Sequence, residues 1–253
     1  MEINFKNKVV LITGGASGAG EKIVRQFAKT GCDIAFTYCG SKDKAIQLVD
    51  ELKDIKIKAY QFNQADIDSI KPFIDKVIED FGHIDILLNN AGIYPAKAIN
   101  DISEKDFDEM FDVNTKGVFF LTREVANKMD KGSIINISSI NADNPSVMLS
   151  HYGASKAAVE FETKALAYEF GPKIRINCIA PGLIYKKGQE AYIPGWVESY
   201  SERSALKRVV KPEEIANTAI FLASDLASAI TGQTITVDCG IMLAPIFNNE
   251  LRS

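Results

Sequence analysis

The sequence contains 253 residues, of which 46% are hydrophobic and 25% are charged, and its formal net charge is −4. A chain of this length can bury a large core, while its acidic balance and the lack of a Lys/Arg run argue against nucleic-acid binding. The N-terminus enters a strand pattern directly instead of forming a signal peptide, and no apolar run is long enough to span a bilayer. We therefore expect a cytoplasmic protein that binds neither nucleic acid nor membrane.

The cysteines and histidines predict no metal site. The four cysteines are scattered without C-x-x-C spacing, which argues against both zinc and a disulfide framework. Reduced thiols in a cytosolic protein are the simplest interpretation. With only two histidines in the chain, a histidine-rich metal centre is also disfavoured.

Short apolar runs alternate with longer amphipathic stretches along the whole chain. The strand candidates are Lys8–Thr13, Asp33–Tyr38, Ile57–Phe62, Ile84–Asn89, Ser133–Ser138, Ile174–Ala180 and Thr234–Asp238. The helix candidates are Gly18–Thr30, Lys42–Asp54, Ser69–Phe81, Ser103–Met129, Tyr152–Phe170 and Pro212–Ala223. This alternation predicts an α/β fold: a doubly wound, Rossmann-type parallel sheet of seven strands with helices on both faces.

No linker or repeat divides the chain, so residues 1–253 are predicted to form a single dinucleotide-binding domain. The stretch 184–206 breaks the alternation with glycine, proline and four aromatic residues. An insertion of this kind in a compact domain is typically functional, and we expect a lid over the substrate.

The first strand leads into a glycine-rich turn, Thr13–Gly20, which an amphipathic helix follows. Such a turn lets backbone approach a pyrophosphate closely, and the helix N-terminus favours its negative charge. The alternative is a turn that only permits tight packing of helix on strand. The spacing is G-x-x-x-G-x-G and no Gly-Lys-Ser/Thr is present, which disfavours a P-loop ATPase. The predicted cofactor-binding residues here are Gly14, Ala16, Ser17, Gly18, Ala19 and Gly20.

Later strand ends extend this predicted cofactor site. The second strand ends in Tyr38 where an acid would select NAD, and Ser41 and Lys42 could contact a 2′-phosphate. We therefore predict NADP(H) as the preferred cofactor, with NAD(H) as the alternative; Lys42 could equally be a solvated residue opening the next helix. The third and fourth strands add Asp66, Ile67, Asn90, Ala91 and Gly92.

Tyr152 and Lys156 stand four positions apart in a predicted helix, with Ser139 thirteen residues before Tyr152. Positions i and i+4 share a helix face, so the Lys156 ammonium could lie beside the Tyr152 phenol and lower its pKa. Tyr152 would then be a proton donor or acceptor, with the Ser139 hydroxyl holding a substrate oxygen. The spacing alone could arise by chance.

Taken as an ordered set, these motifs resemble those of the short-chain dehydrogenase/reductase family, from Lys8 to Gly240. The resemblance implies a catalytic tetrad of Asn114, Ser139, Tyr152 and Lys156 and hydride transfer with a nicotinamide. Asn114 would distort its helix and hold a water; the alternative is a helix Asn bonding its own backbone. Further implied cofactor contacts are Pro181, Gly182 and Ile184, together with Tyr152 and Lys156, of which Lys156 would hydrogen-bond the nicotinamide ribose.

The chain departs from the family pattern at Ala19, Lys186 and Cys239, where a larger aliphatic residue, Thr and Gly are usual. Substrate walls are expected from the stretches 141–149 and 93–96 and from the lid. The predicted substrate-binding residues are Ser139, Asn141, Met148, Leu149, Tyr152, Tyr185, Tyr192 and Trp196. Core packing would explain any one of the apolar residues among them equally well.

We therefore predict an NAD(P)(H)-dependent oxidoreductase that interconverts a carbonyl and a secondary alcohol, with Tyr152 as general acid/base. The sequence resembles 3-oxoacyl-acyl-carrier-protein reductases, which implies an acyl carrier protein as partner and a homotetramer as assembly. Basic side chains that could dock a carrier are Arg123, Lys128, Lys131 and Lys173. Alternatives are a sugar, steroid or small-alcohol dehydrogenase, or a nucleotide-sensing regulator without catalysis.

Overall fold

The computed structural model describes residues 3–185 and 195–244, and these form a seven-stranded, fully parallel sheet. The strand order is β3-β2-β1-β4-β5-β6-β7. The strands are β1 (Val9–Ile12), β2 (Asp33–Tyr38), β3 (Ile57–Gln61), β4 (Ile86–Asn89), β5 (Gly132–Ile137), β6 (Ile174–Pro181) and β7 (Thr234–Val237). The predicted fold class is confirmed, and each strand lies within two residues of its predicted bounds at either end.

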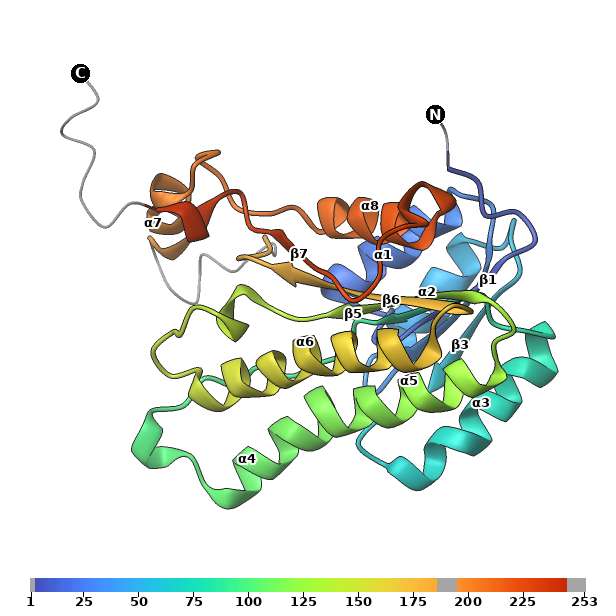
Figure 1. Cartoon of the computed structure of the whole chain (residues 1–253), viewed down its shortest axis with the longest axis horizontal. Helices are drawn as coiled ribbons and strands as arrows, with labels where there is room; N and C mark the ends of the chain where they lie inside the picture. The colour runs from blue at the N-terminus through green and yellow to red at the C-terminus, as the bar shows by residue number, and fades with distance from the viewer. Residues whose placement is uncertain (1–2, 186–194, 245–253) are drawn as a thin grey trace.

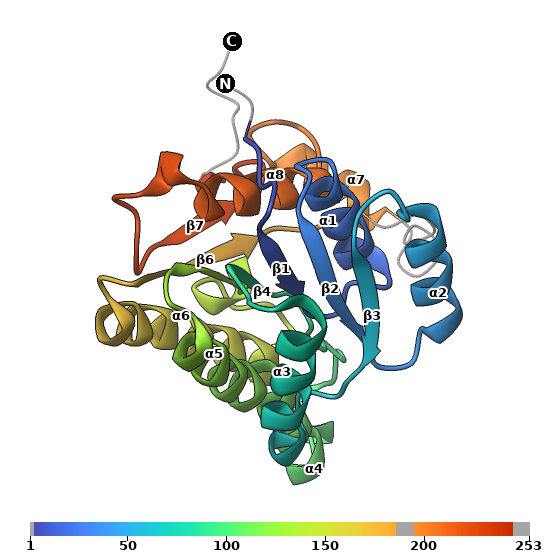
Figure 2. The same ribbon diagram turned by 90° about the vertical axis from the view of Figure 1, so that its right-hand side faces the viewer.

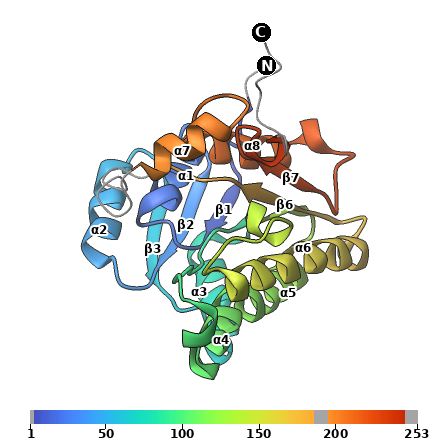
Figure 3. The ribbon, with the colours of Figure 1, turned by 90° about the vertical axis from the view of Figure 1, so that its left-hand side faces the viewer.

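Helices cover both faces of the sheet (Figure 1). One layer contains α1 (Gly18–Ala28), α2 (Lys42–Glu51) and α8 (Pro212–Ala223), and the other contains α3 (Ile67–Phe81), α4 (Glu104–Phe111), α5 (Gly117–Lys128) and α6 (Ser150–Phe170). Figure 2 shows the three layers from the edge where the strands begin. The remaining helix, α7 (Trp196–Arg203), lies near the edge where they end (Figure 3).

Alternation along the strands divides the core between the two layers. In β1, Val10 and Ile12 pack in the cluster under α1 and α8, whereas Val9 and Leu11 pack in the cluster under α3 and α5. All four side chains are almost completely buried. Successive side chains of a strand point to opposite faces, so a strand covered on both sides must be apolar throughout.

The strand order reverses between β1 and β4. The chain builds β1, β2 and β3 toward one edge of the sheet and then returns to place β4 on the other side of β1. The loops that follow β1 and β4 therefore diverge at the carboxyl ends of these strands. Ligands of open α/β sheets bind at such a switch point.

Two helical predictions need correction. The predicted helix Ser103–Met129 is divided by a π-helical segment, η2 (Asp112–Lys116), between α4 and α5. The second correction is α7, which occupies part of the stretch predicted as an irregular lid. Residues 186–194, with Lys186 and Tyr192, lie outside the described residues.

Short 3-10 segments complete the described structure. They are η1 (Ile99–Asp101), η3 (Ile140–Ala142), η5 (Asp225–Ala227) and η6 (Ile241–Leu243). Across residues 3–185 and 195–244, none of the helices has the length and apolar character that crossing a membrane requires.

Candidate active site

The glycine-rich turn joins β1 to α1 and leaves the start of the helix open. Gly14 has a φ of +67°, a conformation that side chains with a Cβ rarely adopt. Its N–H donates to the Thr37 hydroxyl at 3.0 Å, and the Gly15 N–H donates to the Thr37 carbonyl at 2.8 Å, which ties the turn to β2. Ser17 is the N-cap of α1, and its side chain caps none of the described helix N–H groups. These N–H groups are suited to an anion.

The turn also packs closely against the loop after β4. The Asn90 side chain donates to the Thr13 carbonyl at 2.9 Å, and the Thr13 hydroxyl accepts from the backbone N–H groups of Asn90 and Ala91. A Cβ added to Gly20 would lie 2.0 Å from the Gly14 carbonyl oxygen. Only glycine fits at position 20 while the turn keeps this shape.

The residues fit a dinucleotide at this edge of the sheet. A strand, a tight glycine turn and an uncapped helix N-terminus supply the geometry that a pyrophosphate requires. At the adenosine end, Tyr38 closes β2, Ser41 and Lys42 begin α2, and the exposed Asp66 precedes α3. None of the positions from 38 to 42 holds a carboxylate. Tyr38, Ser41 and Asp66 thus lie in the segments that follow or close the carboxyl ends of β2 and β3.

Ser139 and Tyr152 lie together at this edge. Ser139 lies two residues after the end of β5 and Tyr152 is in the first turn of α6, and the Ser139 hydroxyl is near enough to the phenol to act on its pKa. Ser139 is buried, and its hydroxyl also accepts from the Asn141 N–H at 3.1 Å. The Tyr152 ring remains partly accessible. The structure therefore presents one phenol and one hydroxyl that can bind the same substrate oxygen.

The expectation that Lys156 holds the Tyr152 pKa low is wrong for this structure. Burial raises the pKa of Tyr152, the hydrogen bond with Ser139 opposes that change, and the nearby Tyr94 adds to it. The Lys156 ammonium is 5.9 Å from the centroid of the Tyr152 ring and donates to the Ile137 carbonyl at 2.8 Å instead. Desolvation of the charged phenolate outweighs a cation at that distance.

Lys156 is itself buried on the inner face of α6. Its side chain is only 4% exposed, and this burial lowers the pKa of the ammonium to about 8. Lys156 is therefore mostly protonated at neutral pH, close to the point at which it gives up its proton. A lysine in that state can pass a proton to or from a neighbouring group.

Asn114 lies at the centre of the π-helical segment and is completely buried. Its amide pairs twice with the backbone of Ile93: Oδ1 accepts from the Ile93 N–H at 2.9 Å, and Nδ2 donates to the Ile93 carbonyl at 2.8 Å. Nδ2 also contacts the Ser155 hydroxyl at 3.2 Å. The expected distortion of the helix is present, and the side chain bonds another segment's backbone instead of its own helix.

Gly92 brings Asn114 and Lys156 close to each other. A Cβ on Gly92 would lie 3.1 Å from Asn114 Oδ1 and 3.4 Å from Lys156 Nζ. Both side chains therefore border the loop after β4. The structure brings all four predicted catalytic side chains to one region, although their roles remain a prediction.

Tyr94 belongs to this region and was missed as an individual site residue. Its ring packs edge-to-face on the Tyr152 ring, with the centroids 6.2 Å apart and the planes at 61°. The sequence assigned the stretch 93–96 to a substrate wall without distinguishing this side chain. The contact joins residues 58 positions apart, and neither periodicity nor a motif could reveal it.

The turn after β6 is bound to α7. The Leu183 N–H donates to the Tyr200 hydroxyl at 3.0 Å, and a Cβ on Gly182 would lie 2.5 Å from that oxygen. Ile184 forms a bridge with Val210. This places the predicted contacts Pro181–Ile184 beside α7, and the lid stays a prediction.

Of the other predicted substrate residues, Tyr192 lies outside the described residues and Trp196 begins α7. Asn141 is in η3, and Met148 and Leu149 directly precede α6. Met148, Tyr185 and Trp196 are exposed apolar side chains. Cys239, which replaces the usual glycine, has a φ of +57° and is buried, so the unusual residue adopts the backbone conformation that glycine favours.

The fold and this group of side chains define an α/β oxidoreductase of the dinucleotide-binding class. The family model described as enoyl-(acyl carrier protein) reductase matches residues 14–242. The chain belongs to the short-chain dehydrogenase/reductase family.

Individual relatives match over almost their full length. The chain is 38% identical to the 3-oxoacyl-[acyl-carrier-protein] reductase FabG of Staphylococcus epidermidis, covering 94% of this chain and 100% of that protein. A short-chain glucose/ribitol dehydrogenase structure from Brucella melitensis has a TM-score of 0.90 at 30% identity, covering 95% and 99%. A short-chain dehydrogenase from Burkholderia cenocepacia in complex with NADP has a TM-score of 0.87 at 30% identity, covering 94% and 98%.

Proposed function

We propose that this protein is an NADP(H)-dependent reductase that converts the keto group of a 3-oxoacyl thioester into a secondary alcohol. The observation that carries the proposal is the partly accessible Tyr152 side chain in the first turn of α6, with the Lys156 ammonium 5.9 Å from its ring centroid; burial raises the pKa of the phenol, which keeps it protonated at neutral pH. A protonated phenol at an open edge of the site is the state that reduction of a carbonyl needs.

In this mechanism the Ser139 and Tyr152 hydroxyls both donate hydrogen bonds to the substrate carbonyl oxygen. Tyr152 transfers its proton to that oxygen as negative charge develops there, and Ser139 stabilises the charge. Lys156 then restores the proton of Tyr152, because its own pKa of about 8 places it near the balance between the two protonation states. Asn114 holds the loop at Ile93 that borders these groups.

When bound, the nicotinamide would supply the hydride. The backbone of Gly14–Gly20 and the N-terminus of α1 would hold the pyrophosphate of the cofactor. Asn90–Gly92 and Pro181–Ile184 would lie along the nicotinamide half of the cofactor. Tyr38, Ser41 and Lys42 favour NADP(H), because no acid is present there to repel a 2′-phosphate. The Burkholderia cenocepacia relative, which was solved in complex with NADP, supports the same choice.

The substrate class is supported by the relatives named as 3-oxoacyl-[acyl-carrier-protein] reductases, including those from Staphylococcus epidermidis and Thermotoga maritima. Exposed apolar side chains around the site, such as Met148 and Trp196, suit an acyl chain. A carrier protein as acyl donor is part of this proposal.

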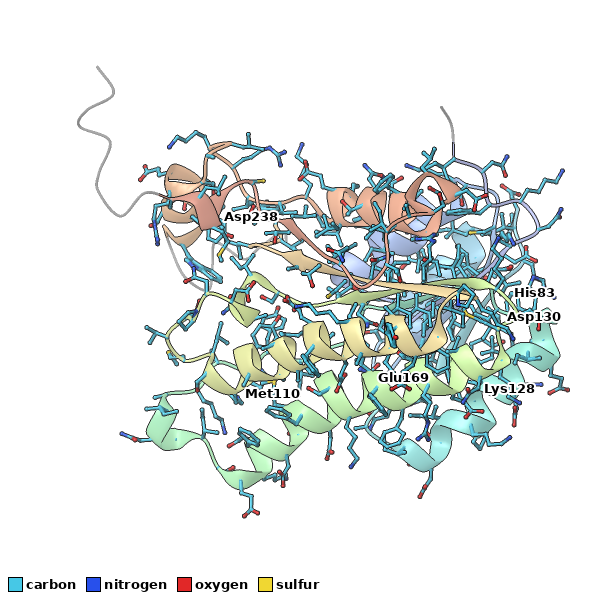
Figure 4. All side chains as sticks on the ribbon, in the orientation of Figure 1. His83, Met110, Lys128, Asp130, Glu169 and Asp238 are labelled. Carbon is cyan, nitrogen blue, oxygen red and sulfur yellow. The ribbon has the colours of Figure 1, made fainter. Side chains whose placement is uncertain are left out.

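A carrier protein that docks on the basic residues Lys128, Lys131 and Lys173 would have to serve the active site of another subunit. Lys128 ends α5, Lys131 precedes β5 and Lys173 precedes β6, so they lie at the edge where the strands begin. Tyr152 lies at the opposite edge; in Figure 4 the labelled Lys128 and Asp238 mark the two ends. A carrier bound there would deliver its acyl group to the site of a neighbouring subunit.

We further propose that copies of the chain associate through α4 and α6. Phe161 and Tyr168 on α6 are 71% and 90% exposed, and Phe107 on α4 is also exposed. Exposed aromatic side chains on two helices that contact each other are a candidate protein contact. Light scattering of the purified protein tests this, with Phe161→Asp expected to yield a smaller species; the homotetramer itself stays a prediction.

The decisive experiment follows the absorbance of NADPH during incubation with acetoacetyl-CoA. Tyr152→Phe should lower kcat by about 10² to 10⁴ while NADPH still binds, because it removes only the transferable proton. Tyr168→Phe, the same exchange at an exposed position of the same helix, is the matched control. Near-native turnover by Tyr152→Phe would rule out the proposed mechanism, and turnover that requires NADH would overturn the cofactor assignment.

A further inference from the structure

Tyr94 occupies a position that the proposed chemistry does not use. Its ring covers one side of Tyr152, with 6.2 Å between the ring centroids, yet the Tyr94 side chain is 55% exposed. A side chain buried only for packing would not leave half of its surface at the opening beside the proton donor. The exposed part of the ring is available to a bound molecule.

The backbone around Tyr94 is fixed on both sides. One residue before it, Ile93 makes two hydrogen bonds with the buried Asn114 amide. Three residues after it, the Lys97 N–H donates to the Met148 carbonyl at 3.0 Å, and the Lys97 ammonium pairs with Asp106 at 2.6 Å. The chain on either side of Tyr94 is therefore held by three other segments, through Asn114, Met148 and Asp106.

The same hydrogen bond brings two apolar loops together. Because Lys97 is bonded to Met148, the loop that carries Tyr94 lies beside the loop that carries Val147 and Met148. Val147 and Met148 are 91% and 47% exposed. Met148 has a φ of +67°, so its backbone is held in a conformation that a residue with a Cβ rarely adopts. The exposed side chains of Tyr94, Val147 and Met148 therefore belong to two adjoining loops, one of which packs on the Tyr152 ring through Tyr94.

We propose that Tyr94 is a specificity-determining residue: its ring is the wall on which the alkyl chain of the substrate packs beside the reacting carbonyl. The inference rests on the proposed function and sharpens it, since it selects 3-oxoacyl groups with a long alkyl chain over the short acetoacetyl group. The Tyr94 hydroxyl is not needed for this role, because packing depends on the ring.

The test compares two thioesters, acetoacetyl-CoA and 3-oxodecanoyl-CoA, with NADPH and the full-length protein. For each variant the measured quantity is the ratio of kcat/KM for the long substrate to that for the short one. Both values come from one preparation, so a partly unfolded variant leaves the ratio unchanged. The variants are Tyr94→Ala, Tyr94→Phe and, as a control, Ile46→Ala, which truncates an exposed apolar side chain on α2.

Tyr94→Ala is expected to lower the ratio about tenfold, a typical effect of removing apolar contact from a substrate pocket. Tyr94→Phe and Ile46→Ala should keep the wild-type ratio. An unchanged ratio in an active Tyr94→Ala variant would overturn this inference and leave the proposed function intact, and so would a tenfold loss in Tyr94→Phe. Inactivity of the wild type toward both thioesters would overturn the proposed function together with the inference.

Discussion

Replacement of Asn114 by Leu tests whether the Asn114 amide anchors the loop at Ile93. The two side chains are similar in size, so the buried space remains filled, but the amide is lost. Ile93 then has no partner for its N–H and its carbonyl, which Asn114 now pairs at 2.9 and 2.8 Å. The loop that carries Tyr94 loses these two direct hydrogen bonds to the π-helical segment.

The cost follows from the two groups left unpaired. A buried donor or acceptor without a partner costs about 1 to 3 kcal/mol. Ile93 is only partly buried, so water can replace some of what is lost, while the leucine adds apolar contact with Met110. We expect Asn114→Leu to lose about 2 to 4 kcal/mol of the free energy of unfolding. Without the anchor, Tyr94 and Tyr152 would be positioned less accurately, and this should also lower kcat/KM by about 10²-fold.

Urea unfolding and steady-state kinetics measure the two effects separately. Asn114→Asp is the informative companion, because its carboxylate can accept from the Ile93 N–H but cannot donate to the Ile93 carbonyl. Its free energy of unfolding and its kcat/KM should both lie between those of the wild type and those of Asn114→Leu. An Asn114→Leu variant within 0.5 kcal/mol of wild type and fully active would refute the anchoring role, since that is about the scatter of a neutral surface substitution.

Three further outcomes follow from other parts of the molecule. Gly20→Ala should weaken NADPH binding at least about tenfold in a fluorescence titration, because a methyl carbon 2.0 Å from the Gly14 carbonyl forces the turn to move; unchanged affinity would contradict this. Arg175→Met should lose about 2 to 4 kcal/mol in denaturant unfolding, since the guanidinium caps the carbonyls of Leu222, Ala223, Ser224 and Ile230; Arg175→Lys should recover part of the loss. Burial raises the pKa of Glu162 from 4.5 to about 7. The ionised Glu162 carboxylate therefore destabilises the folded state, and this effect is absent below pH 4.5 and grows as the pH rises to about 7. Glu162→Gln should therefore gain about 1 to 2 kcal/mol at pH 8, with allowance for partial exposure, and nothing at pH 4; equal gains at both pH values would show that the charge is not responsible.

The fold could be predicted almost completely from the sequence because it depends on local signals. Runs such as Val9–Ile12 are apolar throughout, which indicates a strand covered on both faces, and glycine or asparagine follows most of them. The convergence of the glycine turn, Ser139 and Tyr152 follows from the topology, since parallel strands place their carboxyl ends at one edge.

What the sequence could not reveal depends on distances through space. Burial raises the pKa of Tyr152, and the Lys156 ammonium lies 5.9 Å from the centroid of the Tyr152 ring; helix spacing shows neither. The contact of Tyr94 with Tyr152 and the bond of Tyr200 to Leu183 join segments whose separation in the sequence carries no signal. The helix α7 was missed because it is short and follows Pro194 and Gly195 in the sequence, which favour a turn.

The π-helical segment has a consequence for how this site can change. A π turn accommodates an additional residue between two α-helical stretches, so removing one residue from 112–116 would restore an uninterrupted α-helix. That deletion would rotate α4 by about 100° relative to α5, because each residue of an α-helix turns the chain by that angle. The face of α4 that now packs inward, with the fully buried Met110, would then point elsewhere. The chain therefore tolerates substitutions along α4 far more readily than any change in the number of its residues.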